Sequence, residues 1–288
     1  MHLMLIRVAK TLACLLCLQA LPLSFLQAGT SRPVVPFEIA PELFHYAYEE
    51  PGVMQTSGMM VGISGVLSCR VPESIRVIDL FRIEAEASRG RLDYISKRNE
   101  GAIKGVDNTV IEARALLGKE VYSTGKSAVT LFSGFGYRQL HDNGSGKFTS
   151  EGNPYYDRES NYLFIPVIFE LSPLNSHGWG IGGTVEYDYF LSGMQESELT
   201  DANKEGYTYS DDLKNKQHHG YGLRVSLKAT KKYPPCSLVI EPFLRYWKVG
   251  TSDEDAIEVG NEGESEPLTY VEPNNHTTQY GLKVALLF

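Results

Sequence analysis

Apolar residues recur at every second position over ten stretches of the chain, and this alternation constrains the fold more than any other feature. Because successive side chains of a β-strand point to opposite faces, each stretch is expected to be a strand with one apolar face. Helical spacing is nearly absent, so an all-β fold is predicted. The ten stretches are residues 44–49, 59–68, 81–88, 111–117, 130–138, 162–171, 179–189, 221–228, 238–246 and 280–288.

The connections between these stretches alternate in length. Short ones (71–76, 122–127, 172–178 and 230–237) alternate with long ones (50–57, 92–106, 141–160, 193–219 and 250–275). Short periplasmic turns and long extracellular loops are typical of a closed antiparallel transmembrane β-barrel with both termini in the periplasm. We therefore predict a ten-stranded barrel. Eight or twelve strands would follow if one weak stretch is not a strand or one long loop hides a hairpin.

The N-terminal segment, residues 1–28, is predicted to be a secretory signal peptide. Arg7 and Lys10 precede an apolar stretch from Thr11 to Leu26, and the segment ends on the small residue Ala28. Cleavage near Ala28 leaves a periplasmic segment, residues 29–41, and a barrel, residues 42–288. The alternatives are an uncleaved membrane anchor and, because of Cys14, a lipoprotein.

Two further properties concern the mature chain. Its Cys69 and Cys236 would lie in a compartment that permits disulfides, and pairing is left open because it requires Cα atoms within about 7 Å. The whole chain has a formal net charge of −8, which argues against nucleic-acid binding.

Charged residues of both signs occupy the polar face of the predicted strands. In a soluble β-sandwich, the competing fold, these charges would simply face water, whereas in a narrow barrel they must pair across the lumen. A ten-stranded barrel is only slightly wider than an eight-stranded one, whose interior side chains fill. We predict a lumen closed by ion pairs, the alternative being a narrow pore. The candidates are Arg82, Glu84, Glu86, Glu112, Arg114, Glu186, Arg224, Glu241 and Arg245.

The C-terminus carries the second argument for a membrane barrel. The chain ends on an aromatic residue, and apolar residues step back from it by two: Tyr280, Leu282, Val284, Leu286 and Phe288. This stretch resembles the signal that the barrel-assembly machinery of Gram-negative bacteria recognises in outer-membrane proteins. The resemblance implies export, assembly by that machinery with the help of periplasmic chaperones, and a place in the cell outer membrane among lipid and lipopolysaccharide.

The chain as a whole resembles a family of uncharacterised proteobacterial outer-membrane β-barrel proteins. The resemblance covers most of residues 42–288, implies location and architecture, and carries no activity. It rests on Tyr48–Pro51, Gly134–Arg138, Asp157–Ser160, Glu241–Trp247 and Glu272–Asn275.

The strand count also resembles that of the omptin proteases, whose chemistry requires paired aspartates and an Asp-x-His pair. No histidine of the mature chain has an aspartate two positions before it, and the only Asp-x-Asp, at Asp253 and Asp255, lies in the last long loop. A shared strand count supports no protease assignment. We therefore expect no enzyme, no catalytic residue and no cofactor, with an omptin-like rim protease as the weakest alternative.

Three further groups are weighed against simpler interpretations. The acidic loop 250–275 offers oxygen ligands for Ca²⁺ or Mg²⁺ but matches no calcium-loop spacing, and a solvated loop is favoured. His218 and His219, with His141 and Asp211–Asp212, are better explained as strand-entry residues than as a metal site. Aromatic residues gather near strand ends, where membrane-interface girdles explain those that face outward and a carbohydrate-binding rim is the alternative. They are Tyr46, Tyr48, Tyr137, Tyr162, Trp179, Tyr187, Tyr189, Tyr221, Tyr246 and Trp247.

Overall fold

The computed structural model describes residues 36–288 except 73–76, 174–177, 205–206, 234 and 262–263. The predicted signal peptide and residues 29–35 lie outside the described residues. Within the described part, the only helix is a short 3₁₀ turn, Leu199–Ala202. No helix there is long and apolar enough to cross a membrane.

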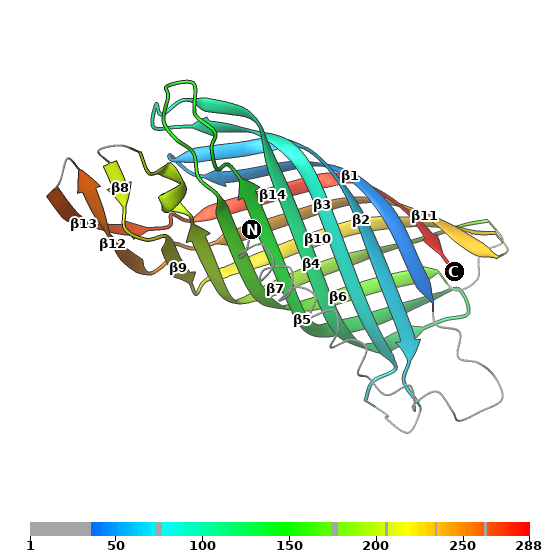
Figure 1. Ribbon diagram of the computed structural model, residues 1–288. Coiled ribbons are helices and arrows are strands. Elements are labelled where there is room, and N and C mark those ends of the chain that lie inside the picture. Colours follow the sequence, from blue (N-terminus) through cyan, green and yellow to red (C-terminus); the bar gives the residue numbers. More distant parts are fainter. Residues whose placement is uncertain (1–35, 73–76, 174–177, 205–206, 234, 262–263) are drawn as a thin grey trace, which may run out of the picture. The chain divides into compact units, whose positions relative to one another are not determined.

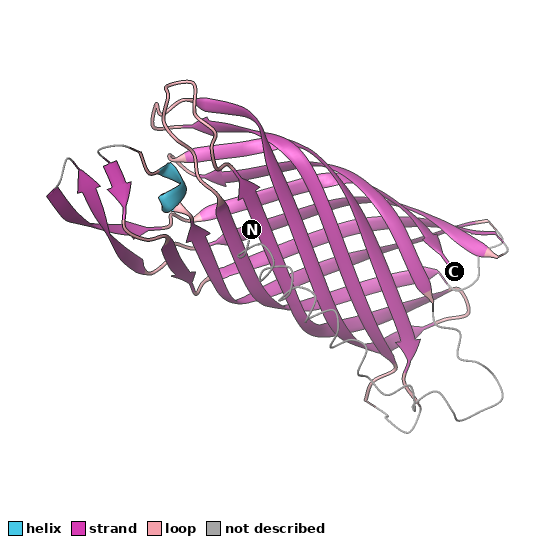
Figure 2. Ribbon diagram, viewed as in Figure 1, coloured by secondary structure: helices cyan, strands magenta, loops and turns pink. Residues whose placement is uncertain are grey.

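Ten long strands form one closed antiparallel sheet, as the alternation predicts (Figures 1 and 2). Each strand pairs with the next, and β14 pairs with β1 to close the barrel without a free edge. The strands are β1 (Phe37–Glu50), β2 (Met54–Arg70), β3 (Leu80–Ser96), β4 (Ala102–Ser123), β5 (Ser127–Asn143), β6 (Arg158–Pro173), β7 (Trp179–Ser197), β10 (Gly220–Tyr233), β11 (Cys236–Val249) and β14 (Asn275–Leu287). Residues 37–41, assigned from the sequence to a periplasmic segment, already belong to β1.

The two ends of the barrel differ. At one, which we call the termini end, the backbone of Phe37 exchanges hydrogen bonds with that of Phe288. At the other, the loop end, two of the five predicted long loops are tight turns, because β1 and β2 are separated only by residues 51–53, and β3 and β4 by residues 97–101. Their strands continue past the alternating stretches, and in β3 the apolar parity reverses there: Leu92 and Tyr94 are buried in the lumen while Arg91 and Asp93 are exposed.

The loop end carries a small folded unit, which we call the crown. It consists of the 3₁₀ turn, β9 (Leu213–Gln217), and a three-stranded sheet of β8 (Tyr207–Tyr209), β12 (Glu254–Asn261) and β13 (Glu264–Val271). The last long loop therefore does hide a hairpin, β12–β13, but one outside the barrel (Figure 1). Leu199, Leu213 and Ile257 form its apolar cluster. β9 pairs with the last residues of β7, so the crown continues the barrel wall.

The outward face of the barrel is a belt of exposed apolar side chains. All five residues of the predicted C-terminal signal, from Tyr280 to Phe288, are exposed on this face. In β1 the apolar parity faces the other way: Phe44, Tyr46 and Tyr48 are buried in the lumen and His45 lies outward. Alternation fixes which residues share a face but not which face is inside, and here the lumen itself contains aromatic residues.

Cys69 and Cys236 are both free thiols. Cys69 lies on β2 and Cys236 on β11, and β1 and β14 run between those strands. Three strand spacings of about 4.8 Å separate the two positions by roughly 14 Å, twice the reach of a disulfide. The pairing left open by the sequence is absent from this structure.

Closure depends on a glycine in β14. Gly281 pairs with Phe44 across the β1–β14 seam, and a Cβ at this position would overlap the Phe44 side chain and the Leu43 carbonyl oxygen. We expect Gly281→Ala to destabilise the barrel by about 1–3 kcal/mol through overpacking. The measurement is the fraction of folded, faster-migrating protein in unheated detergent gels after graded heating. Gly178→Ala, at a position with open space around the new Cβ, is the matched control. Equal melting of the two variants would contradict this account of the seam.

Candidate functional site

The middle of the lumen is closed by a layer of buried ion pairs. The Arg224 guanidinium lies 2.7 Å from Glu112 and 2.9 Å from Asp188, joining β10 to β4 and β7. Arg114 contacts Glu186 at 2.6 Å from across the barrel. Since strand pairing fixes which residues face inward at each level, the layer follows directly from the alternation of charged and apolar positions.

Two further arginines connect this layer to its surroundings. Arg138 approaches Glu112 at 3.1 Å, and Arg245 lies 2.6 Å from Glu86 and 3.2 Å from Glu42. A buried charge that loses its partner costs several kcal/mol of folding free energy. The contribution of each ion pair to stability therefore depends on the others in the network.

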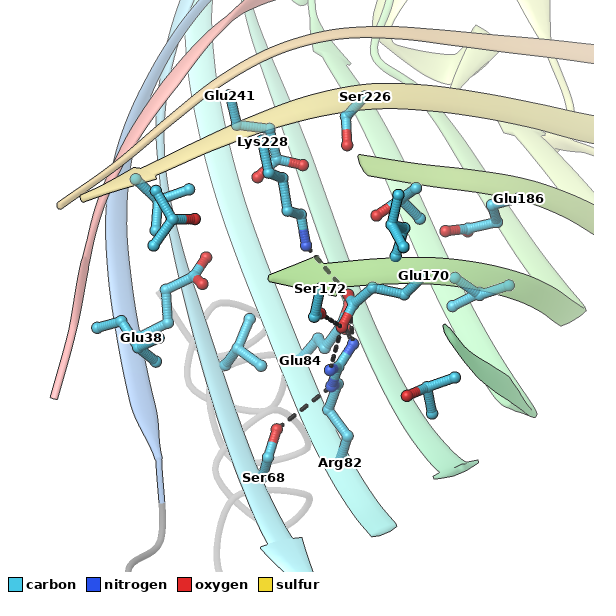
Figure 3. A pocket seen from close by; sticks show the side chains of 18 of the residues that line it. Glu38, Ser68, Arg82, Glu84, Glu170, Ser172, Glu186, Ser226, Lys228 and Glu241 are labelled. Carbon is cyan, nitrogen blue, oxygen red and sulfur yellow. Dashed lines mark hydrogen bonds and ion pairs between the residues drawn. The ribbon is translucent and has the colours of Figure 1, made fainter. Parts of the chain in front are cut away.

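Nearer the termini end, a second charged group surrounds Glu170. The Arg82 guanidinium donates hydrogen bonds to both carboxylate oxygens of Glu170, at 3.0 and 2.9 Å, in a bidentate interaction. Lys228 lies 3.0 Å from the same carboxylate. Lys283 lies 2.9 Å from Glu241. Figure 3 shows Arg82 and Lys228 reaching Glu170 from opposite sides.

All nine lumen residues named from the sequence lie on the inner wall. Glu84 contacts Arg114, and Glu241 pairs with Lys283, which was not among the named candidates. The inner wall holds further charged residues. Parity places Arg138, Glu170, Asp188, Lys228 and Lys283 on the same face as the named candidates, whereas Glu38 and Glu42 share the face of Phe44, which the alternation assigned outward.

An aromatic layer fills the lumen on the loop side of the central ion pairs. The Trp247 ring packs against Tyr162 and Phe164, at centroid distances of 6.2 and 5.0 Å. A second aromatic pair, Phe44 and Phe243, meets edge to face at 5.9 Å beside Arg245, and Phe243 borders the termini half of the lumen. Of the aromatic residues predicted near strand ends, Tyr46, Tyr48, Tyr162 and Trp247 thus lie in the lumen rather than in an interface girdle.

The termini half of the lumen is not filled. A cavity of about 380 Å³ extends around Glu170 and is lined by Glu38, Arg82 and Lys228, with the central residues Glu186 and Arg224 at its inner boundary (Figure 3). Ion pairs and aromatic rings therefore occupy the centre and the loop half of the lumen, while the termini half holds a polar vestibule.

The crown is fastened to the barrel by a buried cluster at the loop end, which we call the latch. One nitrogen of Arg158, Nη2, lies 2.5 Å from Glu50 of β1 and 2.6 Å from Glu272, which precedes β14. Tyr48 donates a hydrogen bond of 2.9 Å to Glu50. Glu50, Arg158 and Glu272 come from three of the five segments on which the family resemblance rests, segments that the sequence alone could not bring together.

The latch holds two carboxylates against one guanidinium. Glu272 is almost completely buried. Burial, reinforced by the neighbouring Glu50 carboxylate and opposed by Arg158, raises the pKa of Glu272 to about 8. Burial therefore favours the protonated form of Glu272 while the crown is docked.

His141 and His218 contact different carboxylates, so these two histidines do not meet at one site. His218 Nε2 lies 2.9 Å from Asp253, and His141 lies 3.7 Å from Asp157. Asp212 accepts hydrogen bonds from Thr200. The acidic loop 250–275 is ordered as the β12–β13 hairpin, and part of its charge is used in the latch and at His218. Among the described residues, the close carboxylate group is Asp157, Glu198 and Asp201, within 4.8 Å of one another.

With this geometry in view, the chain can be compared with known proteins. No protein-family model matches it, and no curated protein matches it in sequence. Its structure is similar to the outer membrane protease OmpT from Escherichia coli, with 13% identity, coverage of 89% of this chain and 98% of OmpT, and a TM-score of 0.50. The translocator domain of the autotransporter NalP from Neisseria meningitidis matches with 10% identity, coverage of 95% and 97%, and a TM-score of 0.40. The chain has the fold of an outer-membrane β-barrel.

The central ion pairs predict a large cost for removing one partner. Arg224→Gln leaves Glu112 and Asp188 buried without their shared cation, and we expect it to lower the free energy of unfolding by about 3–5 kcal/mol. Arg91→Gln is the control, because its ion pair with Asp107 is solvent-exposed and should cost less than about 1 kcal/mol. Urea unfolding in lipid vesicles measures both variants. A loss for Arg224→Gln no larger than that for Arg91→Gln would refute the network as a stabilising unit.

The latch predicts that docking of the crown depends on pH. When the crown is undocked, Glu272 ionises near its ordinary pKa of about 4.3, whereas the docked carboxyl stays protonated up to about 8. Docking is therefore strongest at low pH and weakens as pH rises from about 5 to 8, by about tenfold per unit of effective pKa difference. Hydrogen exchange of the β12 and β13 amides, corrected for intrinsic rates, measures this effect. Glu272→Gln should remove the dependence and Glu266→Gln, an exposed carboxylate of the same hairpin, should keep it.

Proposed function

We propose that the protein is an integral barrel of the outer membrane with a structural or surface-interaction role and a lumen closed to solutes. The observation that carries the proposal is the division of the barrel into two faces: an exposed apolar belt outside, and inside a central ion-pair layer backed by an aromatic layer. An apolar belt on a closed sheet suits a hydrocarbon environment, since every strand of the wall is paired on both sides.

The orientation follows from the ends of the barrel. The termini end would face the periplasm and the loop end the cell exterior, as in barrels that are assembled from the periplasm. A signal peptide, periplasmic chaperones and the barrel-assembly machinery would deliver the chain, and the exposed residues from Tyr280 to Phe288 are suitably placed for recognition as an assembly signal. Lipid and lipopolysaccharide would surround the belt.

A non-catalytic role is supported by the way the charged groups are used. The lumen carboxylates and cations contact one another in ion pairs, so most of their charge is engaged within the barrel. The crown, by contrast, presents a folded acidic surface outside the barrel. It is the part of the molecule best suited to contact another molecule.

One observation favours a second candidate, a narrow pore. The vestibule of about 380 Å³ opens half of the lumen, so displacement of the central and aromatic layers would complete a passage. This alternative needs those layers to move, and each has partners on several strands.

Electrical recording separates the two candidates. The refolded protein, inserted in planar lipid bilayers, should give no stepwise conductance, because ion pairs and aromatic rings fill the lumen across its centre. Insertion is checked by the gel shift of unheated protein, and a known porin recorded in the same bilayers verifies sensitivity. Reproducible steps from the wild-type chain would overturn the closed lumen and establish the pore.

A separate experiment tests the orientation of the barrel in the membrane. In intact cells, added protease should cut within the crown, and antibody labelling should reach it without permeabilisation. A crown that becomes accessible only after the outer membrane is opened would contradict the proposed orientation.

A further inference from the structure

A lysine on the outer wall near the termini end lies between two aromatic rings. The Lys231 ammonium is 5.7 Å from the centroid of the Trp179 ring and 5.2 Å from that of Tyr233, distances at which a cation is attracted to the ring face. Lys231 and Trp179 are direct partners across the β7–β10 ladder. Strand pairing and parity therefore set this arrangement, which does not depend on a loop.

No ion-pair partner of Lys231 is found among the residues that the structure describes. None of their carboxylates lies within 4.0 Å of its ammonium, in contrast to the inward-facing Lys228 on the same strand, which reaches Glu170. Toward the middle of the barrel the wall is apolar, with Ile181 and Leu227 exposed to 65% and 64%. Lys231 thus marks the edge of the belt, with rings on two sides.

This combination matches the boundary between hydrocarbon and headgroups. Trp and Tyr favour that level, where one part of the ring is apolar and another part contacts water. A lysine there reaches the lipid phosphates, and the attraction is about 1 kcal/mol near an anionic surface. An ammonium has three N–H donors, none of which a ring face satisfies as a phosphate oxygen would.

We propose that Trp179, Lys231 and Tyr233 form a binding site for one phospholipid of the leaflet at the termini end. Lys231 binds the phosphate, the two rings flank the headgroup, and the first acyl carbons follow the wall past Ile181. The site rests on the proposed membrane insertion and adds to it a defined position for one lipid. An inorganic phosphate lacks the apolar part that this wall would cover, so the occupant is the lipid.

The test compares lipid retention by matched variants. Wild-type protein is reconstituted in bilayers of phosphatidylglycerol and phosphatidylcholine, extracted in mild detergent, and examined by native mass spectrometry with added phosphatidylglycerol. Lys231→Gln should weaken phosphatidylglycerol binding about fivefold, the equivalent of the about 1 kcal/mol expected of one lysine. Lys231→Arg should retain binding. Lys126→Gln, a change at an exposed lysine of the β4–β5 turn, is the control and should bind as wild type does.

Three results would overturn the site. These are equal weakening by Lys231→Gln and Lys126→Gln, no weakening by Lys231→Gln, or displacement of the lipid by millimolar inorganic phosphate.

A second readout separates this site from membrane insertion itself. Brominated phospholipids should quench the fluorescence of wild-type protein, and the part due to Trp179 should vanish in Trp179→Phe. Absence of that component would show that the wall at Trp179 is not in contact with lipid, which contradicts both proposals. Quenching that persists while Lys231→Gln binds phosphatidylglycerol normally would contradict the lipid site alone.

Discussion

The constraint on which the rest of the structure depends is that charges enclosed in a narrow barrel must neutralise one another. Each inward-facing arginine meets carboxylates from other strands: Arg224 reaches β4 and β7, and Arg245 reaches β1 and β3. These contacts require strand register to be correct to the residue, because a shift by one position would turn every charge toward the apolar belt. The ion pairs of the lumen can therefore form only in the native strand register.

Much of this could be predicted from the sequence, because successive side chains of a barrel strand point alternately into the lumen and outward. The number of strands and the residues that share a face follow from alternation, and the charges of Arg82, Arg114, Arg224 and Arg245 mark their face as the inner one. What alternation cannot supply is which parity is inside, since an aromatic residue suits lipid and a packed lumen equally. That is why Phe44, Tyr46 and Tyr48 lie opposite to the simplest expectation.

Pairing within the lumen and the architecture of the loop end were beyond sequence reasoning for a different reason. Glu241 pairs with Lys283 because the two residues are direct partners across the β11–β14 ladder, and alternation does not encode that register. In the latch, Arg158 contacts Glu50, 108 positions before it, and Glu272, 114 positions after it. No local sequence pattern indicates these contacts. Long-range contacts between single polar residues leave no periodicity.

The sharing of β7 between two partners has a mechanical consequence. Its first part pairs with β10 in the barrel and its last residues, Gly193–Ser197, pair with β9 of the crown. A molecule that pulled on the crown would thus load a ladder of backbone hydrogen bonds continuous with the wall, in addition to the ion pairs at Arg158. Force applied to the crown would pass into the barrel wall along β7 instead of through a flexible loop.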